Sequence, residues 1–172
     1  MRALIVVESV FGNTRRIADE IAAGLTARDD VTAVDLVTPD VAATTVPEDV
    51  DLLVVGAPTH AMTLSRPNTR QQGAMKIPDS KVAVDTGVRE WLAALAKARP
   101  GVTTAVFDTR LAKPSWLVGS AARGIKQRLA KLGYPVAATE HFSVESTEGP
   151  LTTGEPERAR EWAEHLAVPA GV

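Results

Sequence analysis

Cysteine is absent from this chain, which excludes disulfides, thiolate metal sites and thiol redox chemistry. Histidine is scarce, and His60, His141 and His165 lack the spacing of metal ligands. The 172 residues carry a net charge of only −2, so there is no basic footprint for nucleic acid. Apolar runs stay below the ~18 residues that span a membrane, and Met1 leads into a strand pattern without the features of a signal peptide. These absences predict a cytoplasmic protein that binds neither nucleic acid nor membranes, and any redox role would need a bound cofactor.

Apolar runs and helical patterns alternate along the sequence, as in proteins built around a parallel sheet. Strands are expected at Ala3–Val7, Val31–Val37, Asp51–Gly56, Thr103–Phe107 and Val136–Val144, and helices at Arg15–Arg28, Thr86–Lys97, Ser120–Leu132 and Glu157–Leu166. The inner runs are almost continuously apolar, which is typical of strands covered on both faces. The pattern predicts a single α/β domain over residues 1–172. This domain is a three-layer sandwich, in which helices cover both faces of a five-stranded parallel sheet of order 2-1-3-4-5.

Two connections show little apolar periodicity. The first, Thr38–Val50, contains two prolines, so its helix is expected to be short or degraded. The second, Thr59–Asp85, is longer than a connection between a strand and a helix needs to be. A structureless loop of that length in a compact domain is usually functional or mobile.

A segment rich in hydroxyl groups and glycine follows the first expected strand. Ser9 comes just after the apolar run, and the turn Gly12-Asn13-Thr14 leads into the first helix. The first N–H groups of a helix have no partner within the helix, and the helix dipole favours an anion there. The segment therefore suits a phosphate group, although Gly-Asn-Thr is also a common turn before a capped helix.

Two further loops are expected at the same edge of the sheet, because ligands of open α/β sheets bind beyond the carboxyl ends of the strands, where the strand order reverses. The candidate residues in these loops are Pro58, Thr59, His60, Asp108, Thr109, Arg110, Trp116 and Gly119. His60 and Trp116 offer rings that suit stacking on a flat ligand. The alternatives are an exposed loop position for His60 and packing against the sheet edge for Trp116.

The order Ser-x-Phe-Gly-Asn-Thr at Ser9–Thr14 resembles the phosphate loop of flavodoxins and of their NAD(P)H:quinone reductase relatives. The step Gly-x-Pro-Thr at Gly56–Thr59 is similar to the second flavin-contacting loop of that family. The Pro-Thr-His and Glu148–Leu151 segments resemble an actinobacterial branch of it, and Glu148–Leu151 suits either a turn before the last helix or one end of the flavin site. The resemblance covers the whole chain and implies bound FMN, held by Ser9, Phe11, Gly12, Asn13, Thr14, Pro58, Thr59, His60, Asp108, Thr109, Arg110, Trp116 and Gly119.

Two features depart from the flavodoxins that act as electron shuttles. The position of Phe11 often holds a hydroxyl residue in them, and an aromatic residue there is more similar to the quinone-reductase branch. The chain also lacks their strong acidity. In the second and third loops, the cations Arg66, Arg70, Lys76, Arg110 and Lys113 outnumber Asp79 and Asp108. Net positive walls predict a less reducing flavin than in acidic flavodoxins and suit the phosphates of NAD(P)H; the alternative is that these cations lie in solvated loops.

Three functions are compatible with this pattern. An electron carrier would hold FMN and exchange electrons with a redox protein partner. An oxidoreductase would use NAD(P)H to reduce the flavin, which a quinone or similar acceptor would reoxidise. A module that has lost its cofactor would only bind a partner. A receiver domain is excluded because no phosphorylatable aspartate follows the third strand, and the Gly-x-Ser-x-Gly motif of hydrolases is absent.

Overall fold

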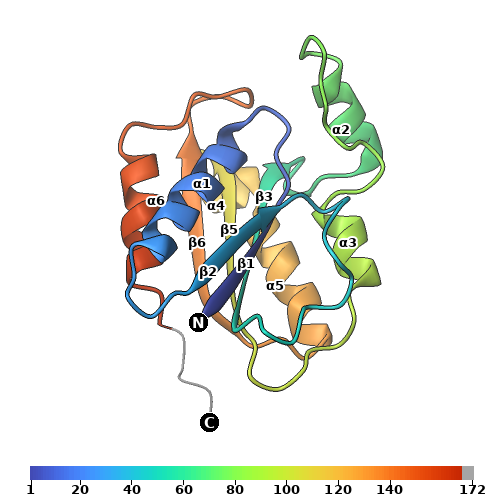
Figure 1. The fold of residues 1–172 in the computed structure, drawn as a ribbon. Coiled ribbons are helices and arrows are strands. Elements are labelled where there is room, and N and C mark those ends of the chain that lie inside the picture. The colour runs from blue at the N-terminus through green and yellow to red at the C-terminus, as the bar shows by residue number, and fades with distance from the viewer. Residues whose placement is uncertain (168–172) are drawn as a thin grey trace.

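A parallel sheet forms the centre of the molecule, and the computed structural model describes residues 1–167 of the chain (Figure 1). Its strands are β1 (Arg2–Val7), β2 (Ala33–Val37), β3 (Leu52–His60), β5 (Thr103–Leu111) and β6 (Val136–Val144), with the short β4 (Thr63–Leu64) outside the main path. The order β2-β1-β3-β5-β6 is parallel throughout, and β4 pairs antiparallel with the end of β3. The predicted order 2-1-3-4-5 is confirmed, because β5 and β6 are the fourth and fifth strands of that path.

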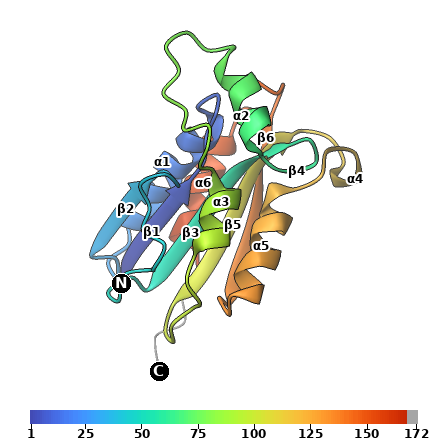
Figure 2. The ribbon, with the colours of Figure 1, turned by 90° about the vertical axis from the view of Figure 1, so that its right-hand side faces the viewer.

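Helices cover both faces of the sheet, as predicted (Figures 1 and 2). The helices are α1 (Asn13–Thr26), α2 (Pro67–Ala74), α3 (Val88–Ala94), α4 (Ser115–Val118), α5 (Ala121–Lys131) and α6 (Glu155–Glu164). One face packs against α1 and α6, and the other packs against α3 and α5. Among the helices that the structure describes, none combines the length and apolar character needed to cross a membrane.

The inner strands β1, β3 and β5 are mostly buried on both faces because each face of the sheet builds its own core. Val6, Val55 and Val106 lie side by side in the register and are fully buried on the side of α3 and α5. Their neighbours Ile5 and Val54 point the other way, toward α1 and α6. Burying one such side chain contributes about 1.5–3 kcal/mol. The same double burial explains why the runs read as almost continuously apolar.

The two connections with weak periodicity differ from the expectation in opposite ways. Thr38–Val50 forms no helix, and its Val46 and Val50 pack into the core from irregular backbone. Thr59–Asp85 is not structureless, because it contains β4 and α2. The four-residue α4 was not predicted either. These elements are short and carry little apolar periodicity, so contacts elsewhere in the fold must hold them.

An ion pair between buried Arg70 and half-buried Glu90 supplies such contacts for α2. Arg70 is fully buried, and its guanidinium donates to the hydroxyl of Ser65 at 2.8 Å and forms an ion pair with Glu90 at 2.8 Å. Buried Glu8, just after β1, accepts hydrogen bonds from Ser65 and from the N–H of Val88. Arg70 was expected to be a cation in a site wall or in a solvated loop. This expectation is wrong, because its guanidinium is buried inside the fold and pairs with Glu90.

Candidate functional site

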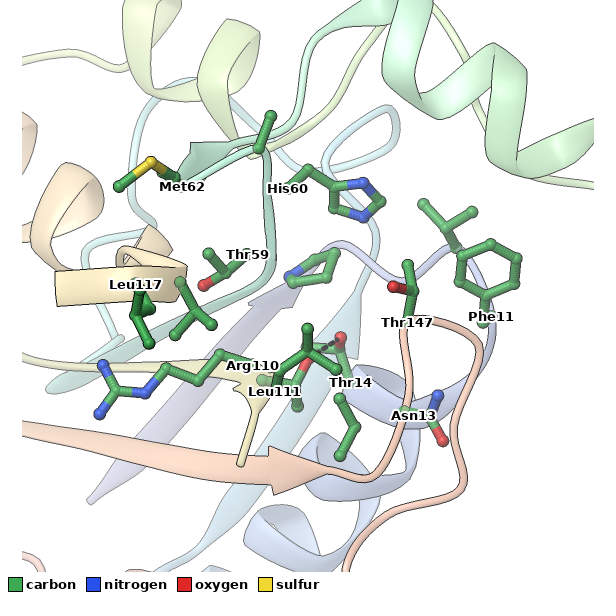
Figure 3. A pocket seen from close by; sticks show the side chains of 16 residues that line it. Phe11, Asn13, Thr14, Thr59, His60, Met62, Arg110, Leu111, Leu117 and Thr147 are labelled. Atoms are coloured by element: carbon green, nitrogen blue, oxygen red, sulfur yellow. Dashed lines mark hydrogen bonds between the residues drawn. The ribbon is translucent and has the colours of Figure 1, made fainter. Parts of the chain in front are cut away.

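A cavity of about 290 Å³ opens at the carboxyl ends of β1, β3 and β5 (Figure 3). This volume lies just below the usual range for small-molecule sites, ~300–1,000 Å³. The lining residues are Val10, Phe11, Asn13, Thr14, Pro58, Thr59, His60, Ala61, Met62, Thr109, Arg110, Leu111, Leu117, Val118, Val144 and Thr147. The candidates Ser9, Gly12, Asp108, Trp116 and Gly119 do not line it. The cavity thus brings together residues from all three of the loops in which candidates were expected.

The start of α1 forms one end of the cavity and is open to a ligand. Gly12 is the N-cap residue at φ 91°, no side chain caps the helix, and its first turn carries no acidic residue. Ser9 faces the turn instead, because its hydroxyl accepts the N–H of Gly12 at 3.1 Å. Helix N–H groups without partners, next to Asn13 and Thr14 in the cavity, suit an anionic group.

A hydroxyl pair joins the first loop to the third. The Oγ1 atoms of Thr14 and Thr109 lie 2.7 Å apart, and both side chains are buried. Thr109 belongs to β5, so the bond holds the first turn of α1 against the sheet. A polar ligand at this end would meet both hydroxyl groups.

The loop after β6 closes another side of the cavity, which sequence reasoning only partly anticipated. Thr147 lines the cavity, and the backbone carbonyl of Glu148 accepts a hydrogen bond from the Asn13 side chain at 3.2 Å. The carboxylate of Glu148 pairs with Lys76 at 2.8 Å, so Lys76 is not a free cation of the site. The Glu-Gly-Pro-Leu turn was the one available signal for this wall.

The hairpin formed by β3 and β4 contributes the opposite wall in an unusual backbone conformation. Ala61 and Met62 have φ values of 45° and 69°, a region that residues other than glycine rarely adopt. Such conformations cost of order 1–3 kcal/mol each and concentrate at ligand-binding positions. Met62 is 58% exposed and also lines the cavity, so this turn presents an apolar side chain at the cavity mouth.

His60 presents its ring to the cavity as a neutral group. Burial, together with the charge of Arg70, lowers the pKa of His60 below its ordinary value. A neutral imidazole can both donate and accept a hydrogen bond. The predicted role of His60 against a ring system therefore stays open to either stacking or hydrogen bonding.

Asp108 lies behind the cavity, in a network of its own. Its fully buried carboxylate meets Nδ1 of His141 at 2.7 Å and accepts from the Ser120 hydroxyl at 2.7 Å and the Ala122 N–H at 2.9 Å. Burial alone would raise the pKa of Asp108, but the hydrogen bonds from His141 and Ala122 outweigh it and hold the pKa below its ordinary value. Asp108 thus anchors the start of α5, and through Thr59, which donates to it at 3.2 Å, it supports the cavity wall.

The remaining candidates of the third loop lie in different places. Arg110 lines the cavity, and Figure 3 shows its side chain extending away from Thr14 on the side of Leu117. Trp116 is 76% exposed and faces a second hollow with Gly119. A Cβ on Gly119 would lie 2.0 Å from the carbonyl oxygen of Met62, so this glycine lets α4 approach the hairpin closely.

The cavity combines a polar end at α1 with an apolar remainder. Apart from Phe11, its apolar lining comes mostly from aliphatic side chains: Val10, Met62, Leu111, Leu117, Val118 and Val144. No cluster of metal-ligating side chains occurs within residues 1–167. The geometry suits a ligand with an apolar part and an anionic end.

Solved structures similar to this one support the same architecture. A flavodoxin from Streptococcus pneumoniae TIGR4 aligns at TM-score 0.66 and 18% identity, covering 99% of this chain and 100% of that one. Megasphaera elsdenii flavodoxin aligns at TM-score 0.60 and 23% identity, covering 95% and 99%. The chain has a flavodoxin-like fold. A WrbA-like flavodoxin from Agrobacterium tumefaciens shares it, at TM-score 0.52 and 16% identity over 95% and 92% of the two chains.

Sequence comparison adds nothing to this result. No family model matches the chain, and no curated protein does. Identities of this size establish the flavodoxin-like fold and leave the ligand to be argued from the site itself. The resemblance to an actinobacterial branch stays a prediction.

Proposed function

We propose that this chain binds FMN in the cavity and transfers electrons through the bound flavin. The observation that carries the proposal is the uncapped start of α1, which opens into an apolar cavity beside Asn13 and Thr14. The N–H groups would hold the phosphate, and each charge-assisted hydrogen bond contributes about 1.5–3 kcal/mol. The aliphatic lining would receive the ring system.

Bound FMN would supply the electron-transfer chemistry, and the protein would supply position and electrostatics. In this arrangement Met62 and Leu117 limit the access of water to the ring, and neutral His60 offers a hydrogen bond without adding charge. Arg110 is the lining residue with a permanent positive charge. Ser9 and Gly12 act by shaping the turn, and Asp108 by anchoring α5.

The first experiment titrates the flavin-free protein with FMN and with riboflavin. Quenching of the flavin fluorescence reports binding. If the start of α1 binds the phosphate, FMN binds at least about tenfold more tightly than riboflavin, since tenfold corresponds to ~1.4 kcal/mol. Equal affinities would mean that α1 does not hold the phosphate. Failure to bind either flavin would favour a cofactor-free binding module.

Reduction by NAD(P)H is a second candidate function. The hollow beside the cavity, with Arg123 and Arg128 in its lining, is the observation that favours it. Steady-state assays with NADH, NADPH and a quinone test it on the flavin-loaded protein. If neither nucleotide bleaches the flavin at a useful rate, the NAD(P)H-dependent oxidoreductase function is refuted.

A further inference from the structure

Positive charge gathers on one face of the molecule, although the chain as a whole is slightly acidic. From Thr109 to Thr139 the sequence contains no aspartate or glutamate, but it contains Arg110, Lys113, Arg123, Lys126, Arg128 and Lys131. A second acid-free stretch, Leu52–Pro78, supplies β3, β4 and α2. Figure 2 shows α4 beside β4, at the end of the sheet where α5 begins. The two acid-free stretches therefore meet next to the cavity.

Four arginines on this face form no ion pair with a carboxylate of residues 1–167. None of the ion pairs within residues 1–167 involves Arg66, Arg89, Arg123 or Arg128. Arg89 instead donates to the backbone carbonyls of Leu64 and Ser65, at 2.6 Å and 2.9 Å. Burial and the neighbouring charges of Arg128 and Arg66 lower the pKa of Arg89 below its ordinary value. These guanidiniums repel one another, and a negatively charged partner would relieve that repulsion.

Exposed apolar side chains accompany the arginines. Trp116 is 76% exposed, Met62 58% and Leu117 50%. Trp116 and Met62 line the second hollow together with Arg123 and Arg128. Tryptophan, methionine and arginine are the residues enriched at protein interfaces, and tryptophan and arginine dominate their energetic centres. We define the basic face as Arg66, Arg89, Arg123, Arg128, Met62 and Trp116.

The basic face adjoins the proposed flavin site. Met62 lines both the cavity and the hollow, and Leu117 lines the cavity one residue after Trp116. A protein seated on this face would cover the cavity mouth. A small nucleotide would occupy only the hollow and leave Arg66 and Arg89, which lie outside its lining, uncompensated. The extent of the face therefore favours a protein.

We propose that the basic face is the docking surface for an acidic one-electron carrier protein. This proposal rests on the proposed function. In each encounter one electron passes between the carrier and the flavin, and no bond forms or breaks. The sign of the charge is opposite to that of the acidic electron shuttles of the same fold. Opposite charges raise the rate of encounter, and salt lowers it.

The test uses two probe proteins of opposite charge, an acidic plant-type ferredoxin and basic cytochrome c. Binding is measured by isothermal titration with flavin-free and flavin-loaded protein, at about 0.01 M and about 0.15 M NaCl, where the Debye length falls from ~30 Å to ~8 Å. Electron transfer from reduced ferredoxin to the loaded protein is then followed by stopped flow. The ferredoxin is expected to bind in a salt-sensitive manner, and cytochrome c to bind at least about tenfold more weakly.

The decisive variant is Arg123→Glu combined with Arg128→Glu. The matched control is Lys97→Glu with Lys131→Glu, which makes the same charge change at the far end of α3 and α5, where the N–H of Ala98 bonds to the carbonyl of Leu132 at 2.8 Å. The first pair is expected to lower ferredoxin binding and the transfer rate at least about tenfold, whereas the control changes them less than about threefold. Circular dichroism and FMN affinity verify that both variants fold and load.

Three results would overturn the proposal. The first is an equal effect of the two double variants on ferredoxin binding, and the second is tighter binding of cytochrome c than of ferredoxin. The third is that ferredoxin does not bind, whereas ADP binds saturably and Arg123→Glu with Arg128→Glu abolishes the ADP binding. The last result would assign the hollow to a nucleotide. Ferredoxin binding to a chain that takes up no FMN would refute the proposed function while leaving the docking surface in place, so the two failures are distinguishable.

Discussion

The hydroxyl groups of Thr14 and Thr109 lie 2.7 Å apart, which joins the first turn of α1 to the end of β5 at the polar end of the cavity. The two residues are 95 positions apart in the sequence. Their contact brings the proposed phosphate site and the third loop together at one end of the cavity.

Replacing Thr14 with alanine tests the phosphate site directly. Loss of one charge-assisted hydrogen bond of about 1.5–3 kcal/mol corresponds to a ~10-fold to ~150-fold weaker Kd for FMN. Riboflavin, which lacks the phosphate, should lose less than about threefold. Fluorescence titration measures both ligands. Thr26→Ala, at the far end of α1, is the control and should change neither affinity; parallel losses for the two flavins in Thr14→Ala would contradict the assignment.

Asp108 makes folding stability depend on pH. Its pKa in the folded protein is below the ordinary value, so the carboxylate stabilises the fold above the unfolded-state pKa, ~3.9. That stabilisation is lost as the pH falls through the folded-state pKa. Asp108→Asn should therefore lower the free energy of unfolding by about 1.5–3 kcal/mol at pH 7. The difference in this free energy between variant and wild type should become smaller in acid.

Urea unfolding at neutral pH and below pH ~4 measures this difference. The control is Asp40→Asn, because the side chain of Asp40 is exposed. A difference that stays constant across the pH range would show that the network does not depend on the ionised Asp108.

Gly119 and Gly101 form a matched pair for testing the seam between α4 and the hairpin. Both have positive φ, 73° and 87°. A Cβ on Gly119 would meet the Met62 carbonyl oxygen at 2.0 Å, whereas one on Gly101 would come no closer than 3.8 Å to any neighbour. Gly101→Ala should cost about 1–2 kcal/mol from backbone conformation alone. Gly119→Ala should lower the free energy of unfolding by about 1–3 kcal/mol more than Gly101→Ala does, and it should weaken FMN binding by moving the cavity wall. Equal losses of stability for the two variants in unfolding experiments would refute this.

Arg110 should raise the reduction potential of the bound flavin. A cation ~8 Å from the reduced flavin, at an effective dielectric of ~20, stabilises it by about 2 kcal/mol, which is about 90 mV for one electron. Redox titration of Arg110→Ala should therefore show a more negative potential, by up to about 90 mV. Lys113→Ala is the control, because Lys113 is exposed and does not line the cavity. An unchanged potential in Arg110→Ala would mean that its charge is screened from the ring.

The sheet could be predicted because each of its strands carries a local pattern. Val54, Val55 and Val106 belong to runs that are apolar on both faces, and the helices between them follow a 3.6-residue repeat. Loops at the carboxyl ends of such strands meet by topology alone. The meeting of Thr14, His60 and Thr109 at one cavity followed from that rule.

Side-chain direction could not be predicted in the same way. Asp108 and Thr109 are neighbours on β5, yet one faces the α5 side and the other faces Thr14. Side chains alternate along a strand, so Asp108 and Thr109 point to opposite faces, and of these two only Thr109 lines the cavity. The sequence contains no signal for which of them does.

Local sequence patterns determine the inner strands, whereas contacts between distant residues determine the short segments and the buried charges. The almost continuous apolar runs identify the inner strands, because burial on both faces requires an apolar residue at nearly every position of such a strand. No such sequence pattern identifies the positions of Arg70 and Trp116 or the elements β4, α2 and α4. Their placement depends on partners far along the chain: Glu90 holds Arg70, and the Met62 carbonyl receives the N–H of Ser120 at 3.3 Å. The cavity wall and the basic face are therefore properties of the folded chain alone.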